Sequence, residues 1–121
     1  MEYKMEYSIN EDEFLEMVES VGWKTYSKEQ VTRALNNTMY MVKISFNDEI
    51  VGIGRVVGDY SIVCMLTDIC VKPKYQGNGI GLKIVNELKK LIEDYIPYDE
   101  QEEKDKEKIK KLMKLMVMRS Y

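Results

Sequence analysis

The most informative absence from this chain of 121 residues is histidine, which does not occur at all. Without an imidazole, the chain cannot build a Ser-His or Cys-His catalytic pair, a histidine-ligated metal site or a histidine acid–base switch. Cysteine is scarce too, because Cys64 and Cys70 are the only two. Two cysteines are too few for a disulfide scaffold or a four-cysteine zinc site, so we expect no metal. On one extended strand they would lie about 20 Å apart, beyond the reach of a disulfide.

Long apolar runs and excess positive charge are also missing. No apolar stretch approaches the roughly 18 residues of a transmembrane helix, and residues 1–4 do not resemble a signal peptide. The formal net charge is −3, so neither nucleic acid nor an anionic membrane is expected as the main partner. Free cysteines are typical of the cytoplasm, where we expect the protein to reside. The length suits one domain that can bury a core without a disulfide or metal.

The hydrophobic pattern predicts an α+β domain with a mainly antiparallel sheet. Helices are predicted after Asn10 and Ser27, because each is followed three residues later by the Glu or Gln of a capping box. Residues 39–46 and 49–57 are predicted to form a hairpin. Its second strand contains Gly52 and Gly54, which indicate a bulge or a close backbone approach. The predicted strands cover residues 3–9, 39–46, 49–57 and 61–71, and a third helix ends before Pro97.

Residues 98–121 differ in composition from the predicted core, residues 1–97. Glu and Lys pair at i, i+4 through the first half, and apolar residues recur at helical spacing in the second, so we expect a charged amphipathic helix over 99–117. Its methionine-rich end needs a surface to pack against, which is either its own sheet or a second copy of the chain; we favour a homodimer. The apolar positions are Ile109, Leu112, Met113 and Met116.

The strongest chemical signal is a glycine-rich loop between a predicted strand and a predicted helix, Gln76-Gly77-Asn78-Gly79-Ile80-Gly81. Glycine lets the backbone turn tightly and approach a ligand. The first N–H groups of the following helix and its dipole attract anions, so the loop predicts a phosphate or pyrophosphate site. A P-loop would need Gly-Lys-Ser/Thr, which is absent. A dinucleotide fold would need another glycine spacing and a second parallel strand, and the pattern predicts no such strand.

Residues 66–81 as a whole resemble the acyl-CoA signature of the GNAT superfamily of N-acetyltransferases, Gln/Arg-x-x-Gly-x-Gly/Ala after a strand and a proline. The three signature positions are occupied by Gln76, Gly79 and Gly81. The resemblance covers roughly residues 3–95. It implies a GNAT-like mixed sheet flanked by helices, and acetyl-CoA as the co-substrate for acetylation of a small-molecule or peptide amine.

The same resemblance implies roles for particular residues. The end of the central strand would hold the pantetheine arm of CoA, a strand-end N–H near Val71 would polarise the thioester carbonyl, and the loop amides would hold the pyrophosphate. The turn between the first two helices, with Trp23 and Tyr26, would contact the acceptor. The implied coenzyme-binding residues are Ile69, Cys70, Val71, Gln76, Gly77, Asn78, Gly79, Ile80 and Gly81.

The catalytic groups of the family do not carry over. The position of its carboxylate base is Met65 here, and Asp68 lies on the opposite face by simple alternation unless a bulge redirects it. Asp68 is therefore a candidate only, and no base is assigned. The family's closing strand, last helix and proton-donating Tyr are not predicted after residue 97. Three functions stay open: an N-acetyltransferase that works by direct attack, an acyl-CoA-binding or sensing module that is catalytically weak, and an interaction protein whose tail helix mediates dimerisation.

Overall fold

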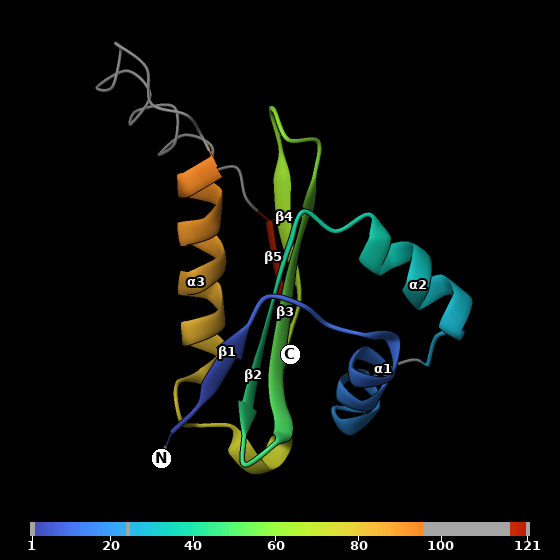
Figure 1. The fold of residues 1–121 in the computed structure, drawn as a ribbon, viewed down its shortest axis with the longest axis vertical. Coiled ribbons are helices and arrows are strands. Elements are labelled where there is room, and N and C mark those ends of the chain that lie inside the picture. Colours follow the sequence, from blue (N-terminus) through green and yellow to red (C-terminus); the bar gives the residue numbers. More distant parts are fainter. Residues whose placement is uncertain (1, 24, 96–116, 121) are drawn as a thin grey trace.

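A computed structural model describes residues 2–23, 25–95 and 117–120. One sheet lies between α3 on one face and α1 with α2 on the other (Figure 1). None of the described helices is long and apolar enough to cross a membrane. The elements are β1 (Lys4–Glu6), α1 (Glu11–Ser20), α2 (Lys28–Asn36), β2 (Tyr40–Phe46), β3 (Glu49–Gly58), β4 (Cys64–Val71), the 3₁₀ helix η1 (Pro73–Tyr75), α3 (Ile80–Tyr95) and β5 (Val117–Ser120).

The sheet has its strands in sequence order, β1-β2-β3-β4-β5. Neighbours from β1 to β4 are antiparallel, whereas β4 and β5 are parallel. Antiparallel neighbours need only short turns, but the parallel pair needs a crossover, and α3 lies in that connection. The predicted α+β class with a mixed, mainly antiparallel sheet is therefore confirmed.

Both predicted capping boxes are present. Asn10 Oδ1 accepts a hydrogen bond from the N–H of Glu13 at 2.8 Å, and Glu13 Oε1 accepts one from the N–H of Asn10 at 3.0 Å. Ser27 and Gln30 exchange the same two bonds at the start of α2. These bonds satisfy N–H groups that have no partner within the helix, so the sequence fixes where α1 and α2 begin.

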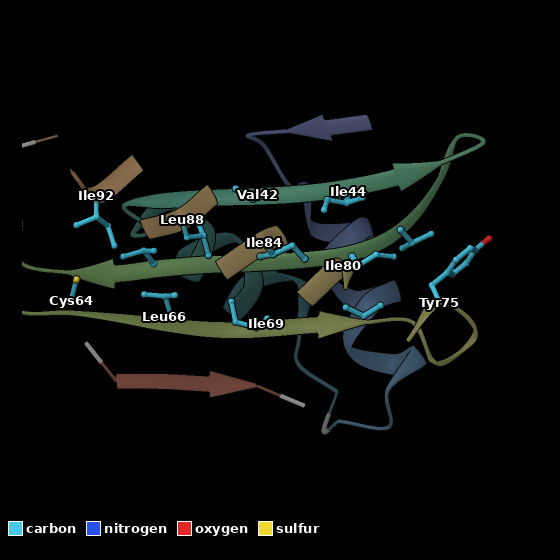
Figure 2. Close-up of a cluster of buried hydrophobic side chains, with 13 residues drawn as sticks. Val42, Ile44, Cys64, Leu66, Ile69, Tyr75, Ile80, Ile84, Leu88 and Ile92 are labelled. Carbon is cyan, nitrogen blue, oxygen red and sulfur yellow. The ribbon is translucent and has the colours of Figure 1, made fainter. Parts of the chain in front are cut away.

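Two hydrophobic clusters cover the two faces of the sheet. The cluster on the α3 face joins α3 to β2, β3 and β4 (Figure 2). The cluster on the other face joins α1 and α2 to the same strands. Near the C-terminal end of β4, side chains alternate between the two clusters: Ile69 and Val71 belong to the α3 cluster, and Cys70 belongs to the α1/α2 cluster. This strand is thus buried on both faces, as its nearly continuous apolar sequence predicts.

Helix α3 approaches β3 closely at two glycines of the strand, Gly52 and Gly54. A Cβ added at Gly52 would lie 2.9 Å from Ile80 Cγ2 and 3.0 Å from Ile84 Cδ1. One added at Gly54 would lie 2.8 Å from Ile69 Cδ1 and would also meet Ile84. Real Cβ atoms do not sit this close to other carbons, so these are the close-approach positions that the sequence indicated.

The structure corrects the prediction for the C-terminal segment. Residues 117–120 form β5, so the expectation that no strand follows residue 97, and that the helix reaches residue 117, is wrong. The edge of β4 that seemed open is partly covered, which removes one argument for a dimer. The rest of that predicted helix, residues 99–116, lies outside the described residues, and it remains a prediction together with the homodimer.

The close packing of α3 yields a stability prediction. Gly54→Ala should lower the free energy of unfolding by about 1–3 kcal/mol, because the new methyl group overpacks the contact with α3. Gly81→Ala is the matched control, since its Cβ would meet only Val71 Cγ2 at 3.8 Å. Urea unfolding followed by circular dichroism measures both. Equal stability of the two variants would contradict the packing argument.

Candidate functional site

The loop between η1 and α3 has free space beside its glycines. Gly77 and Gly79 have φ angles of 84° and 76°, in the left-handed region that favours glycine. A Cβ added at either would meet no atom within 4 Å, so the glycines are needed for the backbone conformation and the space before them is free. The first α-helical bond of α3 runs from the N–H of Lys83 to the carbonyl of Gly79. The N–H groups of the helix's first turn therefore remain available to an anion.

Side chains of the loop hold it to the end of β4. Gln76 Nε2 donates to the carbonyl of Val71 at 3.0 Å, and Asn78 Nδ2 donates to the carbonyl of Tyr75 at 3.0 Å. Ile80, also predicted to bind coenzyme, buries its side chain in the α3 cluster, so only its backbone can face a ligand. Sequence reasoning named Gln76 but did not foresee its bond to the strand.

A network of charged and polar side chains links η1 to α1 and β3. The Tyr75 hydroxyl donates to Glu49 Oε1 at 2.9 Å, and Lys72 Nζ lies 2.8 Å from Glu16 Oε2 and 3.3 Å from Glu49 Oε2. The bond from Tyr75, and then that from Lys72, lowers the pKa of the Glu49 carboxyl. Burial opposes the charge on Lys72, but its two carboxylate partners outweigh burial and raise its pKa. Lys72 therefore ties α1 and β3 to the end of β4.

Near its end, the outer edge of β4 is not paired with any described strand. The N–H of Lys72 donates to the carbonyl of Val51 in β3 at 2.9 Å. Because backbone groups alternate sides along a strand, the N–H of Val71 points away from β3. On that outer side β5 pairs with β4 as far as Ile69. Beyond Ile69, no strand among the described residues faces this edge, which ends beside the glycine loop.

A bulge interrupts β4 just before this edge. Asp68 has a φ of 55°, in the left-handed region. Leu66 and Ile69 both belong to the α3 cluster although they are three residues apart, and the pairing with β3 and with β5 shifts register around Asp68. An extra residue inverts the alternation beyond it. Asp68 is thereby redirected toward the α1/α2 face, as the sequence allowed only if a bulge were present.

Asp68 is paired with Arg55 of β3, which sequence reasoning missed. Arg55 Nε donates to Asp68 Oδ2 at 2.8 Å, and Arg55 Nη2 lies 2.7 Å from the same oxygen. Arg55 Nη1 donates to Thr38 Oγ1 at 2.8 Å and to the carbonyl of Ala34 at 3.2 Å. Both charged side chains are only 12% exposed. A cation within the otherwise apolar run of residues 50–58 was the signal, because a buried charge needs a partner.

The two residues named for the acceptor lie on the same face as this ion pair. Trp23 and Tyr26 are partly buried against the α1/α2 cluster, in the connection between α1 and α2. The rings of Tyr26 and Phe14 lie 6.4 Å apart between centroids, and the Arg55 guanidinium carbon lies 5.7 Å from the Phe14 ring. Packing against the α1/α2 cluster accounts for both positions, and contact with an acceptor remains a prediction.

Both cysteines are buried and free, as expected of small core residues. Burial, more than the nearby Asp68 carboxylate, raises the pKa of the Cys70 thiol to about 12. Burial also raises the pKa of the Cys64 thiol. Since the thiolate is the nucleophile, neither cysteine is suited to attack a thioester. Across the described stretches, no cluster of three or more His, Cys, Asp or Glu side chains could hold a metal ion.

Solved acetyltransferases share this fold. A protein of unknown function from meticillin-resistant Staphylococcus aureus, described as a probable acetyltransferase, superimposes with a TM-score of 0.73 at 26% identity, over 78% of this chain and 71% of the other. An aminoglycoside 6′-N-acetyltransferase complexed with coenzyme A superimposes with a TM-score of 0.66 at 21% identity, over 76% and 56%. At that lower identity, the likeness to the second structure concerns the fold alone.

The sequence itself defines the family. The family model of the acetyltransferase (GNAT) domain matches residues 9–103, so the chain belongs to the GNAT acetyltransferases. An uncharacterized N-acetyltransferase, ycf52-like, from Prochlorococcus marinus is 28% identical over 86 residues, which are 68% of this chain and 48% of the relative. The chain spans about half the length of the curated relatives that it matches first.

The burial of Cys70 gives a chemical prediction. In a Cys64→Ser variant, Cys70 should react with iodoacetamide at pH 8 at least about tenfold more slowly in the folded than in the urea-unfolded chain, because the raised pKa depletes the thiolate. Mass spectrometry measures the rate. Brief exposure to acetyl-CoA should leave Cys70 unmodified. An acetylated Cys70 that forms as fast as product would contradict this prediction and indicate a covalent route.

Proposed function

We propose that this chain transfers the acetyl group of acetyl-CoA to a primary amine by direct attack. One observation carries the proposal: an open loop with two left-handed glycines and the uncovered edge of β4 meet at the same end of the sheet. CoA has a matching shape, with a pyrophosphate at one end of an extended, amide-rich arm. Membership of the GNAT family supports this assignment, and so does the fold shared with an acetyltransferase complexed with CoA.

In this arrangement the coenzyme lies along the end of β4. The backbone of residues 76–81 and the first turn of α3 bind the pyrophosphate through N–H groups. The outward N–H of Val71 binds an amide of the pantetheine arm, in the manner of an added strand. Ile69 pairs with β5 on this side, and the carbonyl of Val71 accepts a hydrogen bond from Gln76, so neither of these groups is assigned to the arm. Cys70 contributes packing only, because its backbone groups face β3 and its thiol faces the α1/α2 cluster.

The proposed reaction needs few protein groups. A neutral amine attacks the thioester carbonyl carbon, the carbonyl oxygen becomes an oxyanion, and the C–S bond then breaks to release the CoA thiolate. The nitrogen loses one proton as it becomes the amide, and the thiolate takes up one proton to give CoA. In this proposal a backbone N–H near Val71, at the end of β4, stabilises the oxyanion. The amine must first lose a proton, since its pKa is about 10.4 in water. Asp68 is already bonded to Arg55, so we assign the proton to solvent or a water chain rather than to Asp68.

An acyl-CoA-binding or sensing module is the second candidate. The observation that favours it is the ion pair between Arg55 and Asp68, because Asp68 is the one carboxylate within β4 and is engaged by this pair. A chain without a dedicated base could bind the coenzyme well and turn it over slowly. The two candidates share the coenzyme site and differ in turnover, so binding and catalysis must be measured separately.

Coenzyme binding is tested by Gly79→Asp. A carboxylate in front of the first turn of α3 should repel the pyrophosphate and abolish the heat of CoA binding in calorimetry. Gly22→Asp is the matched control, because Gly22 has nearly the same φ, 78°, and open space around its Cβ position, but follows α1. The control suffers the same backbone strain and should bind CoA like the wild type. Unchanged affinity of Gly79→Asp would refute this site.

Direct attack is tested by initial rates with acetyl-CoA and a panel of primary amines. We expect intersecting lines in double-reciprocal plots, because no acyl-enzyme separates the two substrates. The value of kcat/KM for the amine should rise with pH as the neutral amine becomes abundant, toward its pKa of about 10.4. Parallel lines would overturn direct attack. CoA binding without turnover of any amine would select the sensing module instead.

A further inference from the structure

Asp68 has a backbone conformation that needs support. Among the described residues, four other than glycine have positive φ angles, and three of them, Asn47, Asp48 and Tyr60, lie in the turns of hairpins. Asp68 alone lies within a strand. Left-handed backbone costs a non-glycine residue free energy, although Asp tolerates it better than most residues. Something outside β4 must therefore favour this arrangement.

The bulge decides which groups β4 presents at its end. Ile53 pairs with Cys70 and Arg55 pairs with Thr67, so two residues of β4 lie opposite the single Gly54. The extra residue shifts the remainder of β4 by one position relative to β3. Without that shift, each backbone N–H beyond the bulge would point to the other edge of β4. The N–H of Val71 would then point toward β3 and not outward.

Arg55 holds the bulge from the α1/α2 face. Its Nε and Nη2 both contact Asp68 Oδ2, while its Nη1 donates to Thr38 Oγ1 and the carbonyl of Ala34. The planar guanidinium thus joins the bulge to the C-terminal turn of α2 with fixed geometry. Lysine, with one compact ammonium group, could not reproduce these contacts.

We propose that Arg55 and Asp68 are positioning residues for the acetyl-pantetheine arm of acetyl-CoA. Their ion pair fixes the bulge, and the bulge places the N–H of Val71 and the outer edge of β4 where the arm binds. This role rests on the coenzyme site proposed above. It assigns neither residue to the chemistry, because both are buried beside the α1/α2 cluster and bonded to each other.

The test compares two ligands that share one end. CoA carries both the pantetheine arm and the pyrophosphate, whereas 3′-phospho-ADP is the part of CoA without the arm. A positioning role predicts a loss confined to CoA, while general damage to the fold would weaken both ligands. Dissociation constants are measured by calorimetry for CoA and by competition for 3′-phospho-ADP. Melting temperatures are recorded in parallel.

The main variant is the double substitution Arg55→Met with Asp68→Asn. It removes both charges together, so no buried charge is left unpaired, and Asn still tolerates the left-handed backbone. Arg55→Lys is the second variant, which keeps the positive charge but loses the planar guanidinium and its several N–H donors. Lys43→Met is the control, because Lys43 pairs with Glu13 at 2.7 Å and is similarly buried, but lies in β2, which β3 separates from β4.

We expect the double variant and Arg55→Lys to bind CoA about tenfold more weakly or worse, which corresponds to one or two misplaced hydrogen bonds to the arm. Their affinity for 3′-phospho-ADP should stay within about twofold of the wild type. Lys43→Met should keep both affinities even where its melting temperature falls.

Three results would overturn this role. Wild-type affinity for CoA in both Arg55 variants would show that the pair is not needed, while leaving the coenzyme site intact. Equal loss of both ligands would show general damage instead of positioning. A wild-type chain that binds neither ligand would remove the coenzyme site itself, and the positioning role with it. Should the double variant fail to fold, Arg55→Lys decides alone.

Discussion

The close contact between α3 and β3 is the constraint on which the rest of the site depends. Two glycines let the helix lie directly on the strand, and the first turn of α3 is anchored there by the buried side chain of Ile80. The position of that turn determines where its N–H groups emerge. A hydrophobic contact in the core therefore sets the location of a polar site at the end of the sheet. The glycine loop connects η1, which follows β4, to the first turn of α3.

Strand β4 connects two halves of the domain that have separate cores. The α3 face carries the glycine loop, and the α1/α2 face carries the partly buried aromatics and the Arg55–Asp68 pair. The transfer proposed for this chain, between two bound molecules, requires that both faces meet at one place. The end of β4 is that place, because its bulge lets side chains face one half while its outer backbone groups remain available to a ligand.

Local signals in the sequence predicted most of the fold. Capping boxes, the hairpin turn and the glycine loop depend on residues a few positions apart, and each was found where expected. The bulge and the Arg55–Asp68 pair depend on contacts across strands, so alternation along β4 alone could not predict them. The strand β5 was missed because four residues give a weak pattern, and the helical spacing of Ile109 to Met116 dominated the same region.

The parallel pairing of β4 with β5 has a consequence for how the chain folds. Strands β1 to β4 and their helices join segments that are mostly close in sequence, whereas β5 pairs with residues far upstream of it. Long-range pairing incurs the entropy of closing a long loop before any contact compensates for it, and β5 contributes few backbone pairs in return. We therefore expect β5 to join the sheet last in folding and to leave it first in local unfolding, so that hydrogen exchange should be fastest along the strand that borders the site.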